Sequence, residues 1–415
     1  MSTIAIAAVG SRGDVAPLTG VGARLQQAGH RVVMAAFTPF KELITGCGLE
    51  FREMPVDFTP GADRPDNPAK AFVSLSGPRG MREMGQAIIS ALQDEPADAL
   101  LLPPLAELAG HPLAEAKGIP SIGVRMQPIS ATAAYPPTVL GAWSAGSLGN
   151  RAASDAGAWV IDRVYRRVVA GFRRDLGLPE TSTRALRQAR TQAQWPVLHG
   201  YSPHVLPRPA DWRPGLEVVG YWWPASVAEW EPPSVLTDFL AAGPAPVLIG
   251  FGSTTPTEQQ AQHLSRVVSQ ALRLAGVRGI VQSGWAGLDV VGDDVLTVGE
   301  APHDWLFPQM AAIAHHCGAG TTAASLRAGV PSIALPGPMG DQPFWAQRLQ
   351  QLQVSAATIA QRHLTAQRLA DAIHIAVTDH QLRDNTQQLA NRIHQDDGAA
   401  AVLATVDSLL DQSTI

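Results

Sequence analysis

One segment, His315-His-Cys-Gly-Ala-Gly-Thr-Thr322, combines residue types that can hold an anion. It follows a predicted buried strand and directly precedes the helical pattern of residues 323–328. The N-terminus of a helix offers unpaired N–H groups and a partial positive charge, and glycines such as Gly318 and Gly320 let a phosphate approach the backbone closely. His316, Thr321 and Thr322 add side-chain donors. A Gly-rich turn with a histidine satisfied in the core is an equal alternative for this segment taken alone.

Patterns typical of metal sites are missing from the chain. No Asp-x-Asp occurs, and the acidic pairs Asp293-Asp294 and Asp396-Asp397 lack an accompanying ligand pattern, so a bridging Mg²⁺ is not expected. The adjacent pair His315-His316 does not have the spacing of a zinc site, and Cys317 has no partner at ligand spacing. We therefore expect no metal and no other cofactor, with fixed donors stabilising a bound phosphate.

The elements that position these residues alternate between strands and helices. Residues 4–9 form a continuous apolar run, helical spacing follows over residues 18–28, and residues 31–37 return to a β-rich run. Residues 99–102 and 121–124 continue the strand series. Such alternation predicts parallel doubly wound sheets, whose ligands lie at the carboxyl ends of the strands.

A stretch rich in proline divides the chain. Six prolines crowd the region from about Trp212 to Pro246, where few apolar positions are periodic. After it, residues 247–251, 279–282, 295–298, 311–314 and 332–335 form a second strand series. We predict an N-terminal domain over residues 1–222, a linker over 223–245, a second domain over 246–395 and a C-terminal helix over 396–415, which packs back on the first domain.

Composition limits the classes of partner. The 415 residues are 46% hydrophobic and 16% charged with a net charge of −5, and no Lys/Arg block suggests a surface for nucleic acid or a membrane. The two cysteines, Cys47 and Cys317, fit a reducing compartment, and no apolar run is long enough for an integral membrane segment. We expect a cytoplasmic protein of unassigned oligomeric state.

Further motifs make the chain resemble one family. The segment of residues 315–322 is followed by Gly329-Val-Pro331 and Gly340-Asp-Gln-Pro-Phe-Trp345, and it is preceded by Gly10-Ser-Arg-Gly-Asp-Val-Ala-Pro17 and Pro302-His-Asp-Trp-Leu-Phe307. Together these motifs resemble the UDP-glycosyltransferases of the GT-B fold (glycosyltransferase family 1), in particular sterol glucosyltransferases and bacterial antibiotic glycosyltransferases. The resemblance implies an α/β fold of two Rossmann-like, doubly wound parallel-sheet domains that face a central cleft.

The resemblance implies roles for the donor side. His316, Gly318, Gly320, Thr321 and Thr322 would hold the diphosphate of a nucleotide sugar, assisted by Ser253. Asp341 and Gln342 would bind sugar hydroxyls, since a carboxylate accepts hydrogen bonds and an amide both donates and accepts them. An ordinary turn is the alternative for Asp341-Gln342. Residues expected near the base and ribose are Ser283, Trp285, Ala301 and His303, of which Trp285 is equally suited to packing.

The resemblance also assigns a catalytic residue. Asp14 would act as the general base that removes a proton from the acceptor hydroxyl, which leads to inversion at the anomeric carbon. From its position alone, capping the first helix is the favoured role of Asp14, and both roles are compatible. Ser11, Arg12 and Gly13 of the same loop would reach the phosphates or orient the base.

The acceptor side gives a weaker signal. The composition of residues 125–159 predicts loops with aromatic side chains. Met126, Tyr135 and Trp143 are therefore candidates for the lining of a wide apolar pocket. Ordinary surface loops are the alternative. The irregular residues 57–83 could form a lid.

The leading hypothesis is an inverting, metal-independent O-glycosyltransferase. It would transfer a sugar, most simply glucose from UDP-glucose rather than from a TDP-sugar, to a hydrophobic hydroxylated acceptor such as a polyketide, an ansamycin, a glycopeptide or a sterol. A nucleotide-sugar epimerase and a non-catalytic auxiliary protein of the same fold are the alternatives. A dinucleotide-dependent oxidoreductase is disfavoured because Gly10-Ser-Arg-Gly13 is not a Gly-x-Gly-x-x-Gly turn.

Overall fold

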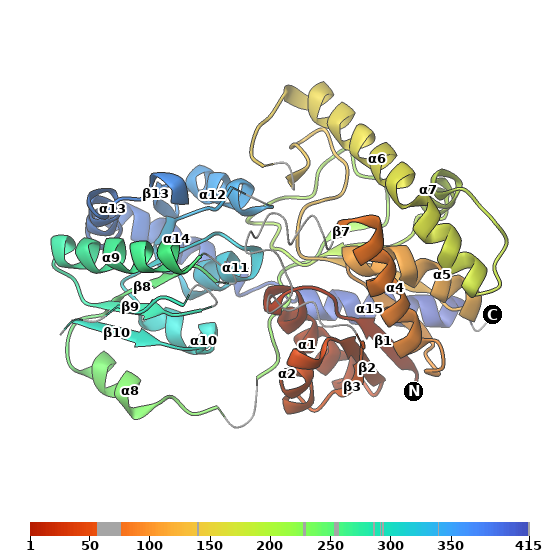
Figure 1. Ribbon diagram of the computed structural model, residues 1–415, viewed down its shortest axis with the longest axis horizontal. Coiled ribbons are helices and arrows are strands. Elements are labelled where there is room, and N and C mark those ends of the chain that lie inside the picture. The colour runs from red at the N-terminus through yellow and green to blue at the C-terminus, as the bar shows by residue number, and fades with distance from the viewer. Residues whose placement is uncertain are drawn as a thin grey trace.

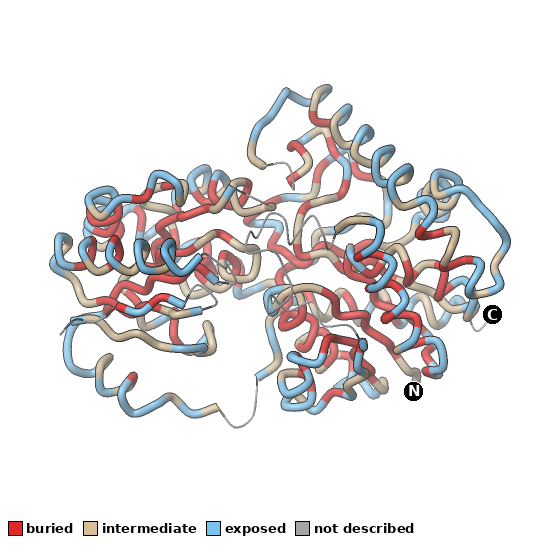
Figure 2. Tube along the Cα trace, in the orientation of Figure 1, coloured by how far each residue is buried: buried red, intermediate tan, exposed pale blue. Residues whose placement is uncertain are grey.

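The computed structural model describes residues 1–55, 76–138, 141–226, 230–252, 257–284, 287–290, 292, 294–338 and 340–413. Figure 1 shows two α/β lobes side by side. In both lobes the described strands are parallel, and Figure 2 shows them as buried centres beneath more exposed helices. The chain therefore has the predicted fold class of two doubly wound parallel-sheet domains.

The N-terminal sheet has the strand order β3-β2-β1-β4-β5-β6-β7. Ile4 pairs with Val32 on one side and with Ala99 on the other, so β1 lies in the interior of the sheet. Ile4 and Ile6 are fully buried, and each such side chain contributes roughly 1.5–3 kcal/mol to folding. The strands are β1 (Thr3–Ala7), β2 (Arg31–Ala36), β3 (Glu50–Glu53), β4 (Ala99–Leu102), β5 (Ser121–Arg125), β6 (Val197–His199) and β7 (Leu216–Val218).

The C-terminal sheet has the order β10-β9-β8-β11-β12-β13. In each sheet the strand order reverses once, between β1 and β4 in the first and between β8 and β11 in the second. Ligands of such sheets bind where the order reverses, at the carboxyl ends of these strands. The strands are β8 (Val247–Gly250), β9 (Gly279–Gln282), β10 (Val295–Val298), β11 (Ala312–His315), β12 (Ser332–Ala334) and β13 (Ser355–Thr358).

Helices cover the sheets. Short 3₁₀ turns join several of them: η1 (Thr38–Phe40), η2 (Pro104–Ala106), η4 (Phe307–Gln309) and η5 (Gln361–His363). The N-terminal half contains α1 (Arg12–Gln27), α2 (Lys41–Gly46), α4 (Pro78–Leu92), α5 (Glu107–Lys117), α6 (Gly146–Asp175) and α7 (Thr183–Gln192). The C-terminal half contains α8 (Ser234–Ala241), α9 (Glu258–Ala275), α10 (His303–Leu306), α11 (Ala319–Ala328), α12 (Gln342–Gln351), α13 (Ala366–Thr378), α14 (His380–Ile393) and α15 (Gly398–Ser413).

The chain returns to the N-terminal lobe at its C-terminal helix. Val402 and Val406 of α15 are fully buried in the core around β1, and Figure 1 shows α15 beneath the N-terminal lobe. Trp222 Nε1 donates a hydrogen bond of 3.1 Å to the carbonyl of Gly398, which ties the crossing point to the end of the first domain. The residue numbers proposed for the domain boundaries stay a prediction.

A shared aromatic cluster joins the two lobes. Tyr135, Tyr201 and Tyr221 from the N-terminal half pack with Phe344 and Trp345 of α12. The ring centroids of Tyr201 and Trp345 are 5.9 Å apart, and those of Tyr135 and Phe344 are 5.4 Å apart. Because these contacts hold α12 against the N-terminal half, they also fix the residues at the start of α12 relative to β1 and its loop.

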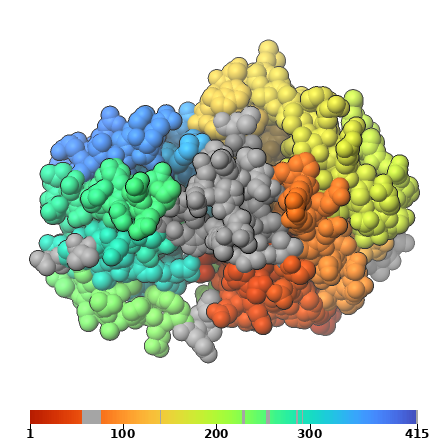
Figure 3. Space-filling view, viewed as in Figure 1, coloured from red at the N-terminus to blue at the C-terminus, as the bar shows by residue number. Residues whose placement is uncertain are grey.

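The prediction of loops over residues 125–159 was wrong for its second half. Residues from Gly146 onward belong to α6, a helix of 30 residues that lies on the outer surface (yellow in Figure 3). Its N-terminal half buries only Asn150, so this part of the helix has little contact with the core. Likewise, the stretch predicted as a linker contains α8.

Candidate functional site

The start of α1 and the start of α11 lie side by side, one from each lobe. The first follows β1 and the second follows β11, so each lies at the point where its sheet reverses strand order. A Cβ atom placed on Gly320 would lie 3.8 Å from the Cα atom of Gly13. The predicted base loop and the predicted diphosphate segment are therefore neighbours.

The N-terminus of α11 has an open anion site. Gly318 occupies the N-cap position, where no side chain accepts a backbone N–H group, and the first turn contains no acidic residue. The unpaired N–H groups of such a turn attract negative charge. Thr321 is partly exposed in this turn, whereas the Thr322 hydroxyl is buried and has no hydrogen-bond partner within the described part of the chain.

His316 lies between two glycines. A Cβ atom on Gly252 would come within 2.3 Å of its Cε1 atom, and one on Gly318 would come within 2.5 Å of its Nε2 atom. Burial lowers the pKa of His316 to about 4, so the ring is neutral at pH 7. Its Nδ1 atom is buried without a partner among the residues that the structure describes. The absence of side chains at both glycines is what makes room for this ring.

The neighbouring His315 has a structural environment. It is fully buried at the end of β11, its Nδ1 atom accepts the backbone N–H of Cys317 at 3.2 Å, and its Nε2 atom lies 3.3 Å from Ser332 Oγ. Burial lowers its pKa to about 3. His315 is thus a core histidine whose ring nitrogens have partners, whereas His316 lies beside the start of α11.

Asp14 caps α1 and also contacts the loop after β5. Its Oδ2 atom accepts the backbone N–H of Ser11 at 2.8 Å and the Ser11 hydroxyl at 2.9 Å, so the predicted capping role is present. Its Oδ1 atom accepts a hydrogen bond of 3.1 Å from Gln127 Nε2. A Cβ atom on Gly10 would lie 2.5 Å from Asp14 Oδ2, so the chain needs glycine there, at φ +134°.

Asp341 lies across the cleft at the N-cap of α12. Burial raises its pKa to about 6, a hydrogen bond of 2.8 Å from Trp345 Nε1 opposes that rise, and the charge of Asp14 adds to it. The carboxylates of Asp14 and Asp341 are therefore within electrostatic range of each other. Gln342 Oε1 accepts the backbone N–H of Gly337 at 2.8 Å, which leaves its Nε2 group as a donor.

Arg12 connects the two lobes. Its Nη1 atom lies 2.9 Å from Glu300 Oε2, and both side chains are at least half exposed, so this ion pair contributes little to stability. The Arg12 charge also lowers the pKa of His303, although burial is the main reason that this pKa falls to about 4. Arg12 is thus positioned at the same edge of the cleft as the predicted nucleoside residues.

The predicted nucleoside residues are only partly described. His303 stacks on Phe307 with ring centroids 4.2 Å apart, and Ala301 is partly buried nearby in sequence. Ser283 Oγ donates to the carbonyl of Val298 at 3.2 Å, so its hydroxyl hydrogen already has a partner. Ser253 and Trp285 lie outside the described residues, as does most of the predicted lid, whose last residues belong to α4.

The three acceptor candidates do not share one environment. Met126 packs in the N-terminal core, Tyr135 belongs to the aromatic cluster between the lobes, and Trp143 is 45% exposed. Tyr135 lies closest in structure to the donor side, through its contact with Phe344 of α12. Their role in an acceptor pocket stays a prediction.

Three residues beside the site were not singled out from the sequence. Gly252 supports His316, Gln127 contacts Asp14, and Trp345 holds Asp341. The glycine after β8 and the polar residue after β5 each follow a strand end, which is a signal for ligand contact in parallel sheets. That signal alone does not tell which of several strand-end residues faces the cleft.

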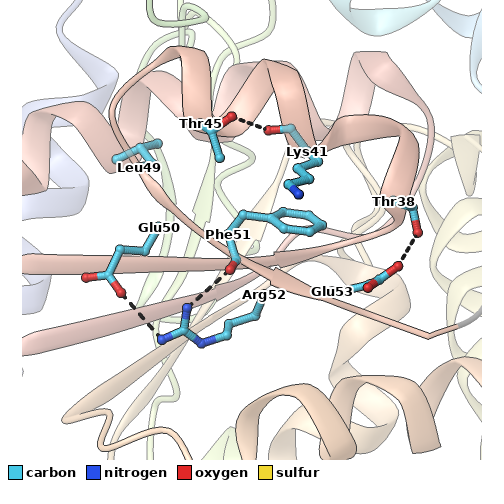
Figure 4. Close-up of a pocket in the computed structure, with 8 residues that line it drawn as sticks. All are labelled: Thr38, Lys41, Thr45, Leu49, Glu50, Phe51, Arg52 and Glu53. Atoms are coloured by element: carbon cyan, nitrogen blue, oxygen red, sulfur yellow. Dashed lines mark hydrogen bonds and ion pairs between the residues drawn. The ribbon is translucent and has the colours of Figure 1, made fainter.

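A separate hollow lies beside the edge strand β3. Figure 4 shows it between β3 and α2, lined by Thr38, Lys41, Thr45, Leu49, Glu50, Phe51, Arg52 and Glu53. Its polar side chains already pair locally, as in the hydrogen bond of 2.6 Å between Thr38 Oγ1 and Glu53 Oε1. None of the residues predicted from the motifs lines this hollow, so we do not count it as part of the site.

Neither a metal-ligand cluster nor a membrane-spanning helix occurs among the described residues. No three histidine, cysteine, aspartate or glutamate side chains in that part of the chain gather as ligands of a metal ion would. Similarly, none of its helices combines the length and the apolar composition that crossing a membrane requires.

Comparison with known families agrees with this geometry. Residues 4–102 match the family described as glycosyltransferase family 28 N-terminal domain. Residues 280–408 match the family described as erythromycin biosynthesis protein CIII-like, C-terminal domain. The first match contains Asp14 and the second contains the 315–322 segment with Asp341.

Curated relatives are similar over nearly the whole chain. O-mycaminosyltylonolide 6-deoxyallosyltransferase of Streptomyces fradiae is 31% identical over 99% of this chain and 98% of its own length. A sterol 3-beta-glucosyltransferase of Arabidopsis thaliana is 31% identical over 95% of this chain. The match covers 63% of the length of that plant protein.

Solved structures share the fold. A glycosyltransferase of kitacinnamycin superposes with a TM-score of 0.72 at 18% identity and covers 98% of this chain and 99% of its own. The glycosyltransferase VinC in complex with DTDP superposes with a TM-score of 0.69 at 16% identity, over 99% of this chain and 100% of its own. With two parallel-sheet lobes, the matched motifs and the Streptomyces relative, this chain belongs to the GT-B-fold glycosyltransferases, in the group of sterol glucosyltransferases and antibiotic glycosyltransferases.

Proposed function

We propose that this protein is an inverting, metal-independent O-glycosyltransferase that moves glucose from UDP-glucose to a hydroxyl group of a hydrophobic acceptor. The observation that carries the proposal is the close approach of Gly13, in the helix start that carries Asp14, to Gly320 at the N-terminus of α11, which has no side-chain cap. One helix start presents a carboxylate, and the other presents unpaired N–H groups. A base and an anion site face to face are what displacement of a nucleoside diphosphate by a hydroxyl group requires.

The reaction balances with these groups. The acceptor oxygen forms a bond to the anomeric carbon while its proton passes to the Asp14 carboxylate. The bond between the anomeric carbon and the diphosphate oxygen breaks, and the electron pair leaves with the diphosphate. Attack from the face opposite the leaving group inverts the configuration, and a positioned carboxylate is effective because the oxygen becomes acidic in an oxocarbenium-like transition state.

The departing diphosphate would be stabilised by the protein itself. The N–H groups at the start of α11 and the neutral ring of His316 supply fixed donors, which need no reorganisation as charge develops. Arg12 would add a full positive charge from the opposite lobe when it leaves Glu300. This set of donors supports a mechanism without a metal ion.

The sugar would lie at the start of α12. Trp345 occupies one oxygen of Asp341, which leaves the other oxygen to accept a sugar hydroxyl, and Gln342 Nε2 remains a donor. The name of the sterol glucosyltransferase supports glucose as the sugar and a sterol as the acceptor, and the name of the O-mycaminosyltylonolide 6-deoxyallosyltransferase supports an antibiotic aglycone as the acceptor. We therefore place a sterol or an antibiotic aglycone in the acceptor role.

The test is a mass-spectrometric screen of the purified protein. UDP- and TDP-sugars are paired with sterols and with polyketide, ansamycin and glycopeptide aglycones, and we expect an adduct of one hexose with UDP-glucose. NMR of the product then gives the anomeric configuration. An adduct with retained configuration would contradict the inverting mechanism, and no adduct with any pair would favour a non-catalytic auxiliary protein.

The variant Asp14→Asn tests the base directly. An asparagine oxygen still accepts the Ser11 N–H, so α1 stays capped while the basic group is lost. We expect turnover to fall by about 10²–10⁴-fold with nucleoside diphosphate affinity unchanged, as measured by isothermal titration calorimetry. Full turnover in this variant would remove Asp14 from the mechanism.

A further inference from the structure

The carboxylate of Asp14 has unequal oxygens. An ionised carboxylate offers about four acceptor positions, two on each oxygen. The backbone N–H and the hydroxyl of Ser11 occupy both positions of Oδ2, at 2.8 and 2.9 Å. Oδ1 receives one hydrogen bond, from Gln127 Nε2 at 3.1 Å, among the residues that the structure describes. One acceptor position of Oδ1 is therefore left.

From this arrangement we infer that Gln127 is a positioning residue that makes Asp14 Oδ1 the oxygen that receives the acceptor's proton, an inference that rests on the proposed function of Asp14 as base. Ser11 holds one edge of the carboxylate and Gln127 holds the other, so the group cannot rotate to exchange its oxygens without breaking both contacts. The remaining position of Oδ1 then has a fixed direction. A general base gains its effect from such fixed geometry.

The amide of Gln127 has a defined orientation. An ionised carboxylate only accepts hydrogen bonds, so the NH₂ group of the amide must face Asp14. A hydrogen bond to a charged partner is also stronger than one between neutral groups. Gln127 belongs to the loop after β5 and contacts a residue 113 positions earlier in the chain. It therefore steadies Asp14 from outside the helix that carries it.

A buried network holds the Gln127 loop in place. Arg125, at the end of β5, forms an ion pair of 2.6 Å with Glu107 and donates a hydrogen bond of 2.8 Å to Ser130 Oγ. Ser130 Oγ lies 2.7 Å from His199 Nε2, and His199 Nδ1 lies 2.9 Å from the carbonyl of Glu217. The loop of residues 126–130 is thus fixed at both ends.

The donors in this network are unambiguous. Burial, with the charge of Arg125 as a smaller cause, lowers the pKa of His199 to about 3, so its ring is neutral. Nδ1–H then donates to the Glu217 carbonyl, which leaves Nε2 to accept the Ser130 hydroxyl. Because every member is paired, and Ser130 and His199 are buried, the loop resists displacement when a ligand binds.

Two substitutions of Gln127 test the inference in steady-state assays of the full-length protein. Gln127→Met keeps the length of the side chain and removes its donor, and we expect kcat to fall by about 10-fold with an unchanged KM for the donor sugar. Gln127→Glu puts a second carboxylate beside Asp14, and we expect the acidic limb of the kcat profile to move by about one unit to higher pH. Asp341, the other carboxylate within range of Asp14, is the same in both variants.

The matched control is Gln26→Met. Gln26 lies on α1 like Asp14 but near the other end of the helix, and its Nε2 atom donates to the Gly48 carbonyl at 3.0 Å. Gln26→Met loses one side-chain hydrogen bond, as Gln127→Met does, and we expect its kcat to be unchanged. Nucleoside diphosphate titration verifies the folding of each variant, and Gln127→Glu decides the question if Gln127→Met does not fold.

The outcomes separate this inference from the proposed function. Wild-type kcat in Gln127→Met together with an unmoved pH profile in Gln127→Glu, while Asp14→Asn is inactive, would overturn the role of Gln127 and leave the base intact. Full activity of Asp14→Asn would overturn the base itself. A fall in kcat with an unmoved profile in Gln127→Glu would reduce Gln127 to a structural contact and would also overturn the inference.

Discussion

The start of α1 and the start of α11 have the same arrangement but differ in the side chain at the third helical position. Each helix follows an interior strand through a glycine-containing turn and begins at the cleft. Ser11 and Gly318 are the N-cap residues, and the third helical positions are Asp14 and Thr321. Asp14 returns its carboxylate to the N-cap N–H, whereas no side chain does so at α11.

This difference assigns an opposite chemical property to each helix start. At α1 the protein supplies its own anion, and that same anion is the proposed base. At α11 the site for an anion stays open, so a diphosphate can take the place that a carboxylate holds at α1. In the proposed mechanism, one side chain at the third helical position therefore separates the turn that carries the base from the turn that would bind the diphosphate.

The largest effect is expected from copying the α1 residue into α11. Thr321→Asp places a carboxylate at the third position of α11, where it would accept the free N–H groups and repel a diphosphate. We expect the dissociation constant of UDP, measured by isothermal titration calorimetry, to rise by about 10–100-fold, as for the loss of one to two charge-assisted hydrogen bonds.

Thr321→Asn is the control for this exchange. It matches aspartate in size and caps a helix through its side-chain oxygen but carries no charge. We expect a smaller loss of UDP affinity in this variant. Equal affinity of Thr321→Asp and the unmodified protein would mean that the diphosphate does not lie at the start of α11, and the comparison with α1 would lose its meaning.

A second effect concerns the glycine that supports His316. Gly252→Ala brings a Cβ atom within 2.3 Å of the ring, so the ring must leave its place between Gly252 and Gly318 beside the start of α11. We expect UDP affinity to fall by about 10-fold, as for the loss of one hydrogen bond to a charged group. Thermal unfolding should also shift down, because both φ and the contact are unfavourable for alanine.

Gly276→Ala separates these two causes. Gly276 has φ +63°, close to the +58° of Gly252, but a Cβ atom there meets nothing within 4 Å. We expect this control to lose about 1 kcal/mol of stability and no UDP affinity. If both variants bind UDP as the unmodified protein does, the placement of His316 is not needed for the diphosphate.

The parts of the fold that the sequence predicted have a common physical basis. β4, β9 and β10 span the predicted residues, and β4 is a continuous apolar run because it is buried on both faces of a parallel sheet. The strands β3, β7 and β13 were not predicted, because none of their residues is buried and they therefore lack a continuous apolar run. The helix predicted from residue 323 begins at Ala319, because its first turn consists of the glycines and threonines of the phosphate segment.

The candidate site was predictable to a similar extent. Glycine, histidine and aspartate after strand ends identified both helix starts, since their residue types limit what such turns can do. Gln127 and Gly252 could not be found in this way, because their importance lies in contacts with Asp14 and His316, residues distant in sequence. Trp345 was part of a motif, but its hydrogen bond to Asp341 depends on how α12 packs between the lobes.

The smallest effect is expected at Asp341, which lies within electrostatic range of the α1 carboxylate. Its pKa in the folded protein is about 6, above the ordinary value of 3.8, so between these values the folded state binds more protons than the unfolded state. Stability therefore falls as pH rises through this window, and the ionised carboxylate destabilises the folded protein at pH 7. Asp341→Asn should unfold at a higher temperature than the unmodified protein at pH 7, and this advantage should shrink toward pH 4.

Asp371→Asn, on the exposed surface of α13, is the control and should show no such dependence on pH. The same Asp341→Asn protein should bind UDP normally and bind UDP-glucose more weakly, because only the sugar would contact this residue. A variant that is equally destabilised at both pH values would show that Asp341 is needed for packing with Trp345. Repulsion between the two carboxylates would then not be a property of the site. The proposed function would have to rest on the two helix starts alone.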